Sequence, residues 1–259
     1  MADITSLQSG AVNDSEKVNW RGDQVATPQG GQSIYKSSTV PLAELGSRLV
    51  VGDRVFRYAQ CGLVPPNAGD LVELGAGFVL SVTGAATGGI AGDKAIYWFS
   101  TTNVAKDYWA EGSICANSGT ATSVGFQYRI KSHAAIATTS TGTLLLYDPL
   151  VVSNAATSKW SIFQNPYKGV TQMTGGTNIA MGVAPIVVTT NDYFWLQTYG
   201  PCEVKCAAVA GVGDPCAAGV TGQVMALATT DGAVTHTVGY AMQICTASER
   251  GLIFLQLAP

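Results

Sequence analysis

The residues that could do chemistry are few, and their spacing does not suit it. The chain has two histidines, His133 and His236, and neither has a metal-ligating residue at a suitable offset in its own segment. The acidic residues are isolated, whereas glycoside hydrolysis needs two carboxylates that face each other across a cleft. A hydrolase acting on cell-surface glycans therefore has no support here. We expect no catalytic residues and no enzymatic activity.

The glycine-rich stretch from Gly84 to Lys94 has some features of a phosphate-binding loop. A Walker loop needs Gly-Lys followed by Ser or Thr, but here Asp93 stands before Lys94 and Ala95 follows it. An acid would then face the phosphate, and the hydroxyl that binds magnesium would be missing. The chain also lacks a GxGxxG motif at the start of a helix. We expect a flexible loop tip and no bound cofactor.

The cysteines offer a second kind of chemistry, metal binding or disulfide formation. There are six of them: Cys61, Cys115, Cys202, Cys206, Cys216 and Cys245. A structural zinc site normally shows two close ligand pairs, whereas the offset from Cys202 to Cys206 along a strand separates two side chains on one face by about 13 Å. Because no secretory segment is evident, we expect a reducing compartment, six buried free thiols and no metal.

Composition and charge exclude two classes of partner. The chain has 259 residues, a net charge of -3 and only 14 Lys and Arg residues, which are dispersed along it. Phosphate binding depends on clustered basic residues, so we expect no nucleic-acid partner. The first twenty residues are polar, and no apolar run approaches the roughly 20 residues of a membrane helix. We therefore expect no membrane partner and synthesis in the cytoplasm as a soluble protein.

The elements that would position any site are strands. Apolar residues make up 47% of the chain, in short alternating runs that Gly, Thr, Asn and Asp interrupt, with turn signals every 8 to 15 residues or so. No stripe with a 3.6-residue period is present. This pattern predicts an all-β protein built from β-sandwich or small β-barrel domains. The expected strands are 71–74, 78–83, 95–100, 123–130, 143–147, 159–163, 179–181, 185–189, 193–199, 203–209, 222–228, 238–245 and 252–257, after a β-rich start at 49–59.

The first 45 residues form an extended N-terminal arm in this interpretation. They contain few large apolar residues and no periodicity, so they cannot bury enough surface to fold alone. We expect Trp20, Arg21 and Tyr35 to anchor the arm to an interface, because such residue types are frequent at binding hot spots. Deleting residues 2–40 is then expected to leave the β domains folded with an unchanged thermal transition.

The remainder divides into two domains. The strand pattern is interrupted between Asn165 and Gly176, where Asn-Pro-Tyr and a Thr-Gly-Gly-Thr loop occur. We therefore expect a central β domain at 46–168 and a C-terminal small β-barrel domain at 169–259.

Three groups of adjacent aromatic residues require burial on both faces of a strand: Tyr97-Trp98-Phe99, Tyr108-Trp109 and Tyr193-Phe194-Trp195. Packing between the domains or between subunits would bury the outward rings, since interfaces favour these residue types. Ordinary two-sided burial within a sandwich explains them as well, and both explanations remain open.

Several stretches of the sequence resemble landmarks of virion proteins of tailed bacteriophages that are typically encoded beside the major capsid protein. They are VGDRVFRYAQCG (51–62), YRIKSH (128–133), LLLYDPL (144–150), NPYKGV (165–170) and YFWLQTYGP (193–201). The resemblance extends over most of the chain from about Arg48 onward, and it carries no catalytic motif.

The resemblance implies a decoration or cement protein on the outer capsid surface, with the major capsid protein as its partner. Such a protein stabilises the shell by multivalent contact, and a trimer at a local three-fold axis is the favoured form of self-association. The alternative is a head-fibre or tail-associated receptor-binding protein that contacts host surface glycans. A long shaft repeat or an exposed aromatic groove would favour that alternative, and the sequence has no shaft repeat.

Overall fold

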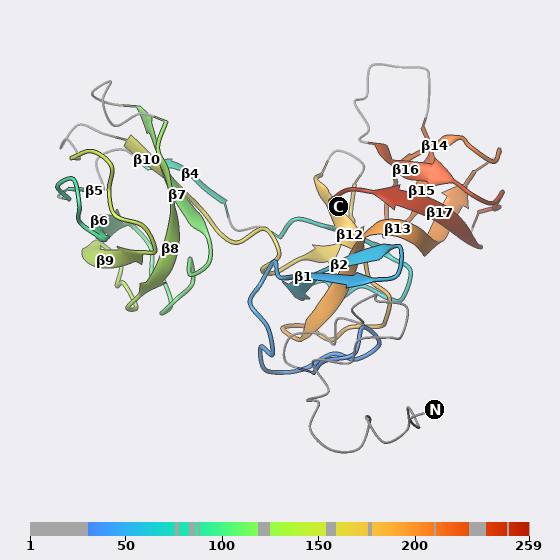
Figure 1. Ribbon diagram of the computed structural model, residues 1–259, viewed down its shortest axis with the longest axis horizontal. Coiled ribbons are helices and arrows are strands. Elements are labelled where there is room, and N and C mark those ends of the chain that lie inside the picture. Colours follow the sequence, from blue (N-terminus) through green and yellow to red (C-terminus); the bar gives the residue numbers. More distant parts are fainter. Residues whose placement is uncertain are drawn as a thin grey trace, which may run out of the picture. The chain divides into compact units, whose positions relative to one another are not determined.

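The structure, a computed structural model, describes residues 31–75, 78–82, 86–87, 89–118, 125–153, 159–175, 178–209, 211–227, 237–247 and 249–258. Within these ranges there are 17 strands and no helix, which confirms the predicted all-β class (Figure 1). The strands are β1 (Arg48–Val51), β2 (Arg54–Gln60), β3 (Leu71–Glu73), β4 (Phe78–Val82), β5 (Ala86–Thr87), β6 (Ala95–Ser100), β7 (Ser113–Ser118), β8 (Gln127–His133), β9 (Ser140–Leu146), β10 (Lys159–Phe163), β11 (Thr171–Gln172), β12 (Ala180–Val183), β13 (Tyr193–Ala208), β14 (Pro215–Ala218), β15 (Val224–Ala226), β16 (Thr237–Ala241) and β17 (Arg250–Gln256).

The chain forms two compact units, and the second is inserted into the first. Unit 1 comprises Met1–Gly75 and Tyr167–Pro259, and unit 2 comprises Ala76–Pro166. The chain leaves unit 1 after β3 and returns at β11, which pairs antiparallel with β3. The two crossing points lie together, since a Cβ atom on Gly75 would be 2.1 Å from the carbonyl oxygen of Gly169. Unit 2 therefore occupies the place of a hairpin loop in unit 1.

This division differs from the predicted one at its first boundary. The boundary at 166/167 is close to the predicted 168/169, but residues 46–75 belong to the same unit as the C-terminal barrel. The reason is that β2 pairs antiparallel with the first half of β13 along Tyr58↔Trp195 and its neighbours. Because β2 and β13 are far apart in the chain, the residue pattern around either strand does not reveal that they pair.

Part of unit 1 is a closed five-stranded barrel. Its strands follow the order β13-β15-β14-β16-β17, and pairing between β17 and β13 closes the ring. All neighbours are antiparallel except β13 and β15, which are parallel. The interior is filled by side chains of all five strands, among them Val204, Cys216, Val224, Val238 and Ile253.

The long strand β13 also belongs to the rest of unit 1. Its first half pairs with β2 and β12, and its second half pairs with β17 and β15. Between the two halves Gly200 has a φ of 89°, and a Cβ atom there would lie 2.3 Å from the carbonyl oxygen of Asp53. Only glycine accommodates both the positive φ and this close approach. The strand therefore bends at Gly200 and passes from one half of the unit to the other.

Residues 31–47 are part of unit 1, which corrects the predicted boundary of the arm at residue 45. Ile34 is buried in a cluster with Phe56, Tyr58 and Trp195. Gln32 is 4% exposed, and its Nε2 donates hydrogen bonds to the carbonyl oxygens of Lys36 at 2.7 Å and Tyr193 at 2.9 Å. Tyr58 donates its hydroxyl to Oε1 of Gln32 at 2.7 Å, and the indole of Trp195 donates to the Gln32 carbonyl at 3.1 Å. A polar segment is thus held by a satisfied buried hydrogen-bond network, which composition alone does not reveal.

Unit 2 is a seven-stranded sheet in the order β4-β10-β7-β8-β9-β6-β5. Its neighbouring strands are antiparallel throughout. The sheet carries its own core, in which Trp98, Trp109 and Trp160 are the largest side chains. Each unit therefore buries apolar surface independently of the other.

The expectation of six free thiols is wrong for one pair. Cys206 and Cys245 form a disulfide with an S–S distance of 2.15 Å, while Cys61, Cys115, Cys202 and Cys216 are free. The paired residues are 39 apart in sequence, and closure of the barrel brings them together. Gly251 lies beside them, and a Cβ atom there would be 2.8 Å from the sulfur of Cys245.

Candidate interaction surfaces

The buried carboxylates serve to hold loops. Asp70 immediately precedes β3, Glu73 is its last residue, and both are almost completely buried. The Asp70 carboxylate accepts hydrogen bonds from the backbone N–H of Asn67 at 2.8 Å and from Nε2 of Gln172 at 2.6 Å. The Glu73 carboxylate accepts the backbone N–H and the hydroxyl of Thr174, both at 2.9 Å. These contacts fix the two ends of the hairpin into which unit 2 is inserted.

His133 is buried and hydrogen-bonded at both ring nitrogens. The backbone N–H of Trp109 donates to Nε2 at 3.1 Å, so Nδ1 carries the proton and donates to the carbonyl oxygen of Ala134 at 2.7 Å. This assigns a neutral imidazole, because Nε2 cannot accept a hydrogen bond when it is protonated. The side chain connects β8 to the 105–111 turn, as expected for a structural histidine. His236 lies outside the described residues.

The free thiols are poor nucleophiles. Burial raises the pKa of Cys202 to about 12 and the pKa values of Cys61 and Cys216 to about 11, and it also raises the pKa of Cys115. A thiol must ionise to attack or to bind a metal, and these remain protonated near neutral pH. Within the described ranges no three His, Cys, Asp or Glu residues form a group that could hold a metal ion. In the same part of the chain no helix is both long and apolar enough to cross a membrane.

One charged cluster lies on the surface of unit 2. The Glu111 carboxylate accepts hydrogen bonds from the guanidinium of Arg129 and from the hydroxyl of Tyr147. The Arg129 guanidinium also stacks over the Tyr147 ring at 4.9 Å. Glu111 lies before β7, Arg129 lies in β8, and Tyr147 directly follows β9, so their contacts connect three parts of the sheet. Sequence reasoning did not identify this cluster, because its members are far apart in the chain.

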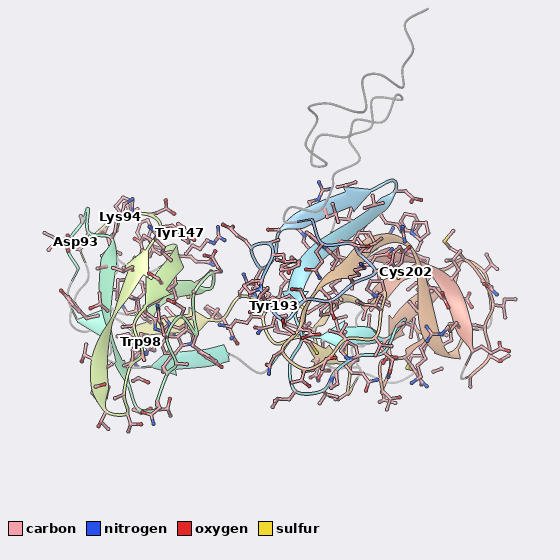
Figure 2. All side chains as sticks on the ribbon, turned by 90° about the horizontal axis from the view of Figure 1, so that it is seen from below. Asp93, Lys94, Trp98, Tyr147, Tyr193 and Cys202 are labelled. Atoms are coloured by element: carbon pink, nitrogen blue, oxygen red, sulfur yellow. A yellow bond between two sulfur atoms is a disulfide. The ribbon has the colours of Figure 1, made fainter. Side chains whose placement is uncertain are left out.

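The outward rings of β6 create an exposed aromatic face on unit 2. Trp98, which is labelled in Figure 2, is 1% exposed and belongs to the core of unit 2. Its neighbours Tyr97 and Phe99 are 46% and 38% exposed. On the neighbouring strand β9, exposed Thr143 and Thr141 pair with Tyr97 and Phe99. The neighbouring Leu145 is also exposed. We call this surface (Tyr97, Phe99, Thr141, Thr143 and Leu145) the unit 2 aromatic face.

The barrel of unit 1 has an apolar face as well. Strand register places Pro201, Phe254, Tyr240 and Pro215 in one row across β13, β17, β16 and β14. Tyr240 is 44% exposed, and exposed Leu252 lies two residues from Phe254 on the same face of β17. We call Pro201, Pro215, Tyr240, Leu252 and Phe254 the barrel apolar face. The other three residues, Pro201, Pro215 and Phe254, are half-buried. Large exposed apolar patches mark interaction sites on soluble proteins, which makes this face a candidate.

The third aromatic group is buried on both faces within unit 1. Phe194 packs with Leu196 in one cluster, and Trp195 packs with Phe56 in another. Two-sided burial therefore accounts for this group, whereas the β6 group leaves two rings exposed.

Of the three predicted interface residues, the structure describes Tyr35. Tyr35 is 61% exposed at the surface of unit 1. Trp20 and Arg21 lie outside the described residues. The two apolar faces were missed because they depend on strand register, although the alternation Tyr97-Trp98-Phe99 already indicated that two of these rings share one side.

Comparison with known proteins gives limited information. No family model matches the chain, and no curated protein matches it. Among solved structures, the N base of the head fibre gp8.5 of bacteriophage phi29 is similar over 62% of this chain and 92% of that chain, with 14% identity and a TM-score of 0.28. A TM-score this low does not establish a common fold.

Proposed function

We propose that the chain is a structural protein of a tailed-bacteriophage virion, located on the outer capsid surface. There it decorates and stabilises the shell by binding several subunits of the major capsid protein. It acts by binding alone, without catalysis, and it self-associates, with a trimer at a local three-fold axis as the favoured form.

The observation that carries the proposal is that one chain presents two separately cored β units, each with its own exposed apolar face. The barrel apolar face and the unit 2 aromatic face are rich in Tyr, Phe, Leu and Pro. Aromatic residues are enriched in protein–protein interfaces. Two binding faces on one chain allow simultaneous contact with neighbouring capsid subunits, and attachment then exceeds the affinity of either face alone.

The second support is the chemistry of the buried polar groups. Asp70, Glu73 and His133 are all engaged in hydrogen bonds that hold loops and strands. The free thiols are kept protonated by burial. Sequence stretches such as VGDRVFRYAQCG and YFWLQTYGP, which resemble tailed-phage virion proteins, favour the phage origin.

The proposal is tested by adding the purified chain to phage capsids that lack it and measuring co-sedimentation. Tyr240→Asp and Phe99→Asp each place a charge in one face and are expected to weaken binding about 10-fold or more, since hot-spot aromatics contribute on this scale. The double variant is expected to lose detectable binding. Light scattering on the free chain measures its oligomeric state.

Val187→Asp is the matched control, because Val187 is exposed in the loop between β12 and β13 and belongs to neither face. It is expected to bind like the unchanged chain. A chain that does not bind capsids but binds host surface glycans would contradict the proposal and support the receptor-binding alternative.

A further inference from the structure

The disulfide anchors one particular segment of the barrel. Cys206 lies near the end of β13, and Cys245 lies in the connection 242–249 between β16 and β17. β13 already pairs with β17 from Tyr199↔Gln256 to Lys205↔Arg250, and β16 pairs with β17. The strands of the ring are therefore held by their own hydrogen bonds, and the disulfide fastens the connection to them.

Among the described residues of this connection, Cys245 has the only buried side chain. Of the seven described residues between 242 and 249, Cys245 is buried and the other six are exposed, including Met242 and Ile244. The backbone is held by hydrogen bonds in both directions between Val209 and Cys245, at 2.9 and 3.2 Å, and by the Cys206 N–H to the Glu249 carbonyl at 2.9 Å. The N–H of Met242 also donates to the carbonyl oxygen of Leu252 in β17, at 2.9 Å. Without the sulfur–sulfur bond, these backbone hydrogen bonds are what holds the described part of the connection to the barrel.

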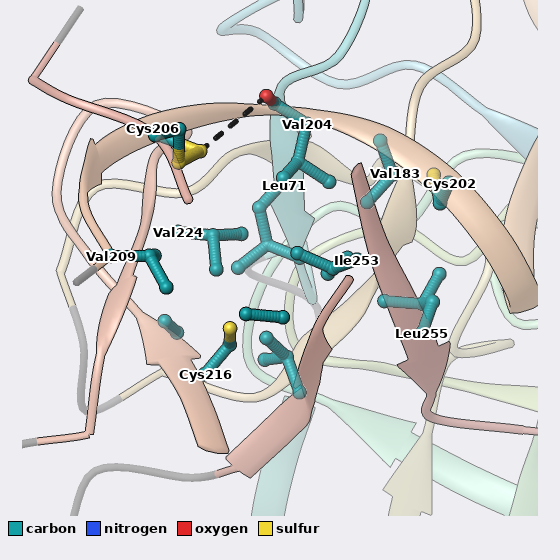
Figure 3. Packing of buried hydrophobic residues seen from close by; sticks show 14 of the residues in the cluster. Leu71, Val183, Cys202, Val204, Cys206, Val209, Cys216, Val224, Ile253 and Leu255 are labelled. Carbon is teal, nitrogen blue, oxygen red and sulfur yellow. Dashed lines mark hydrogen bonds between the residues drawn. A yellow bond between two sulfur atoms is a disulfide. The ribbon is translucent and has the colours of Figure 1, made fainter. Parts of the chain in front are cut away.

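The residues around the two sulfurs favour the pairing of Cys206 with Cys245. Gly251 leaves the space that the two sulfurs occupy, since a Cβ atom there would lie 2.8 Å from one and 2.9 Å from the other. The free thiols of the same core, Cys202 and Cys216, lie apart from the disulfide in Figure 3. Burial keeps these two thiols protonated, so they do not attack the disulfide near neutral pH.

We propose that Cys206–Cys245 is a redox latch, which fixes the 242–249 connection on a barrel that is already folded. In a reducing compartment the two residues are thiols, the barrel is closed and the connection is loosely held. On transfer to an oxidising medium the latch closes and holds Met242 and Ile244 in a defined position on the barrel. Met242 donates its backbone N–H to the carbonyl oxygen of Leu252, a residue of the barrel apolar face. The latch is independent of the proposed function.

The closing reaction is a thiol–disulfide exchange with a small-molecule disulfide, RSSR, such as oxidised glutathione. One cysteine thiolate attacks RSSR, forms a mixed disulfide and releases RS⁻, which takes up a proton. The second cysteine thiolate then attacks the mixed disulfide at the protein sulfur and releases another RS⁻. In total the two protein thiols are oxidised by two electrons, and RSSR is reduced to two RSH.

The test compares hydrogen exchange of the full chain after oxidation with glutathione disulfide and after reduction with a phosphine. Reduction is expected to accelerate exchange in peptides covering 242–247 by about 10-fold or more, and to leave β17 peptides covering 250–256 within about 2-fold. Mapping of alkylated peptides measures the Cys206–Cys245 link in both samples. Cys206→Ser/Cys245→Ser is expected to behave like the reduced chain under both conditions.

The control is Cys202→Ala, which removes a thiol of the same core and is expected to keep the redox response of 242–247. The latch is overturned if reduction leaves exchange in 242–247 unchanged, or if the oxidised chain retains six alkylatable thiols. It is also overturned if 250–256 loses protection together with 242–247, because the disulfide then supports the whole barrel. If the double variant does not fold, comparing the reduced and oxidised forms of the chain with its natural cysteines still distinguishes these outcomes.

Discussion

Cys202 illustrates how burial determines the chemistry of a single residue. It faces the barrel interior from β13, and burial raises its pKa to about 12 from an ordinary value of 9.0. Cys61 and Cys216 are raised to about 11 for the same main reason. A thiol that resists ionisation in the folded state but ionises freely in the unfolded state makes stability depend on pH.

The direction in which stability changes with pH follows from the ionisation of Cys202 in the folded and the unfolded states. Below pH 9 the Cys202 thiol is protonated in both, and its contribution to stability is fully present. Between pH 9 and about 12 the thiol ionises in the unfolded chain alone, so the free energy of unfolding falls as the pH rises. At pH 10.5 the expected loss from Cys202 is about 2 kcal/mol.

Urea unfolding at pH 7 and pH 10.5 measures this loss, and Cys202→Ala is expected to show a pH-dependent loss that is smaller by that amount. The variant also leaves a cavity, but this cost is the same at both pH values. Equal losses in the two proteins would contradict the pKa assigned to Cys202.

At the scale of elements, the segment 31–47 behaves as an additional layer of unit 1. Gln32 and Ile34 reach the cluster around Tyr58 and Trp195, and Ser38 forms a bridge with Tyr193. The segment contains no regular strand. Its attachment depends on side-chain hydrogen bonds, on backbone hydrogen bonds to Tyr193 and Tyr58, and on the packing of Ile34, Ala43 and Leu45 against the same cluster. Deleting residues 2–40 is therefore no longer expected to leave the thermal transition unchanged, because the deletion removes Gln32 and Ile34 from this cluster.

A chain lacking residues 2–40 is expected to melt at a lower temperature than a chain lacking residues 2–30, because the longer deletion removes Gln32 and Ile34. Gln32→Ala is the point variant, and it is expected to cost about 1–3 kcal/mol because it leaves the hydroxyl of Tyr58 and the carbonyl of Tyr193 with fewer partners. Gln243→Ala, at an exposed position, is the control and is expected to be neutral. Calorimetry of these chains is the measurement, and equal melting temperatures for the two deletions would contradict this role.

The elements themselves were largely predictable. The alternation of apolar residues places strands at 78–83, 95–100 and 159–163, where β4, β6 and β10 are found. It also predicts two strands at 193–199 and 203–209, because Gly200-Pro201 looks like a break. The structure has one strand, β13, because Gly200 takes a positive φ and bends the strand without ending it.

The candidate faces and the disulfide were not predictable, for a different reason. The barrel apolar face exists because Pro201, Phe254 and Tyr240 occupy neighbouring positions in the ladder. Cys206 and Cys245 meet only when the barrel closes. Alternation shows which side of its own strand a residue occupies, but register and closure depend on pairings between distant segments.

At the scale of the whole molecule, the insertion of unit 2 between β3 and β11 makes the two units separable. Every strand pairing stays within one unit, and each unit has its own core. Gly75 and Gly169 are close enough that a short turn can join them. Asp70 and Glu73 fix the flanking loops from within unit 1.

Replacing residues 76–166 by a short Gly-Ser turn is therefore expected to leave unit 1 folded, with the Cys206–Cys245 disulfide present. The separate segment 76–166 is expected to fold as well, since its core contains three buried tryptophans. Near-ultraviolet circular dichroism and thermal unfolding of both pieces check this, with the full chain as the reference. If the unit 1 piece is unfolded at 25 °C, unit 1 depends on unit 2 for its stability, and the prediction is wrong.

The same insertion bears on how such a chain diversifies. Because unit 2 enters and leaves through two adjacent glycines, one recombination event at this hairpin can add, remove or exchange it without breaking any ladder of the host unit. Related genes are therefore expected to carry different inserts between the counterparts of β3 and β11, while the barrel is inherited as a block. For the laboratory, this hairpin is a natural place to graft a foreign domain for display.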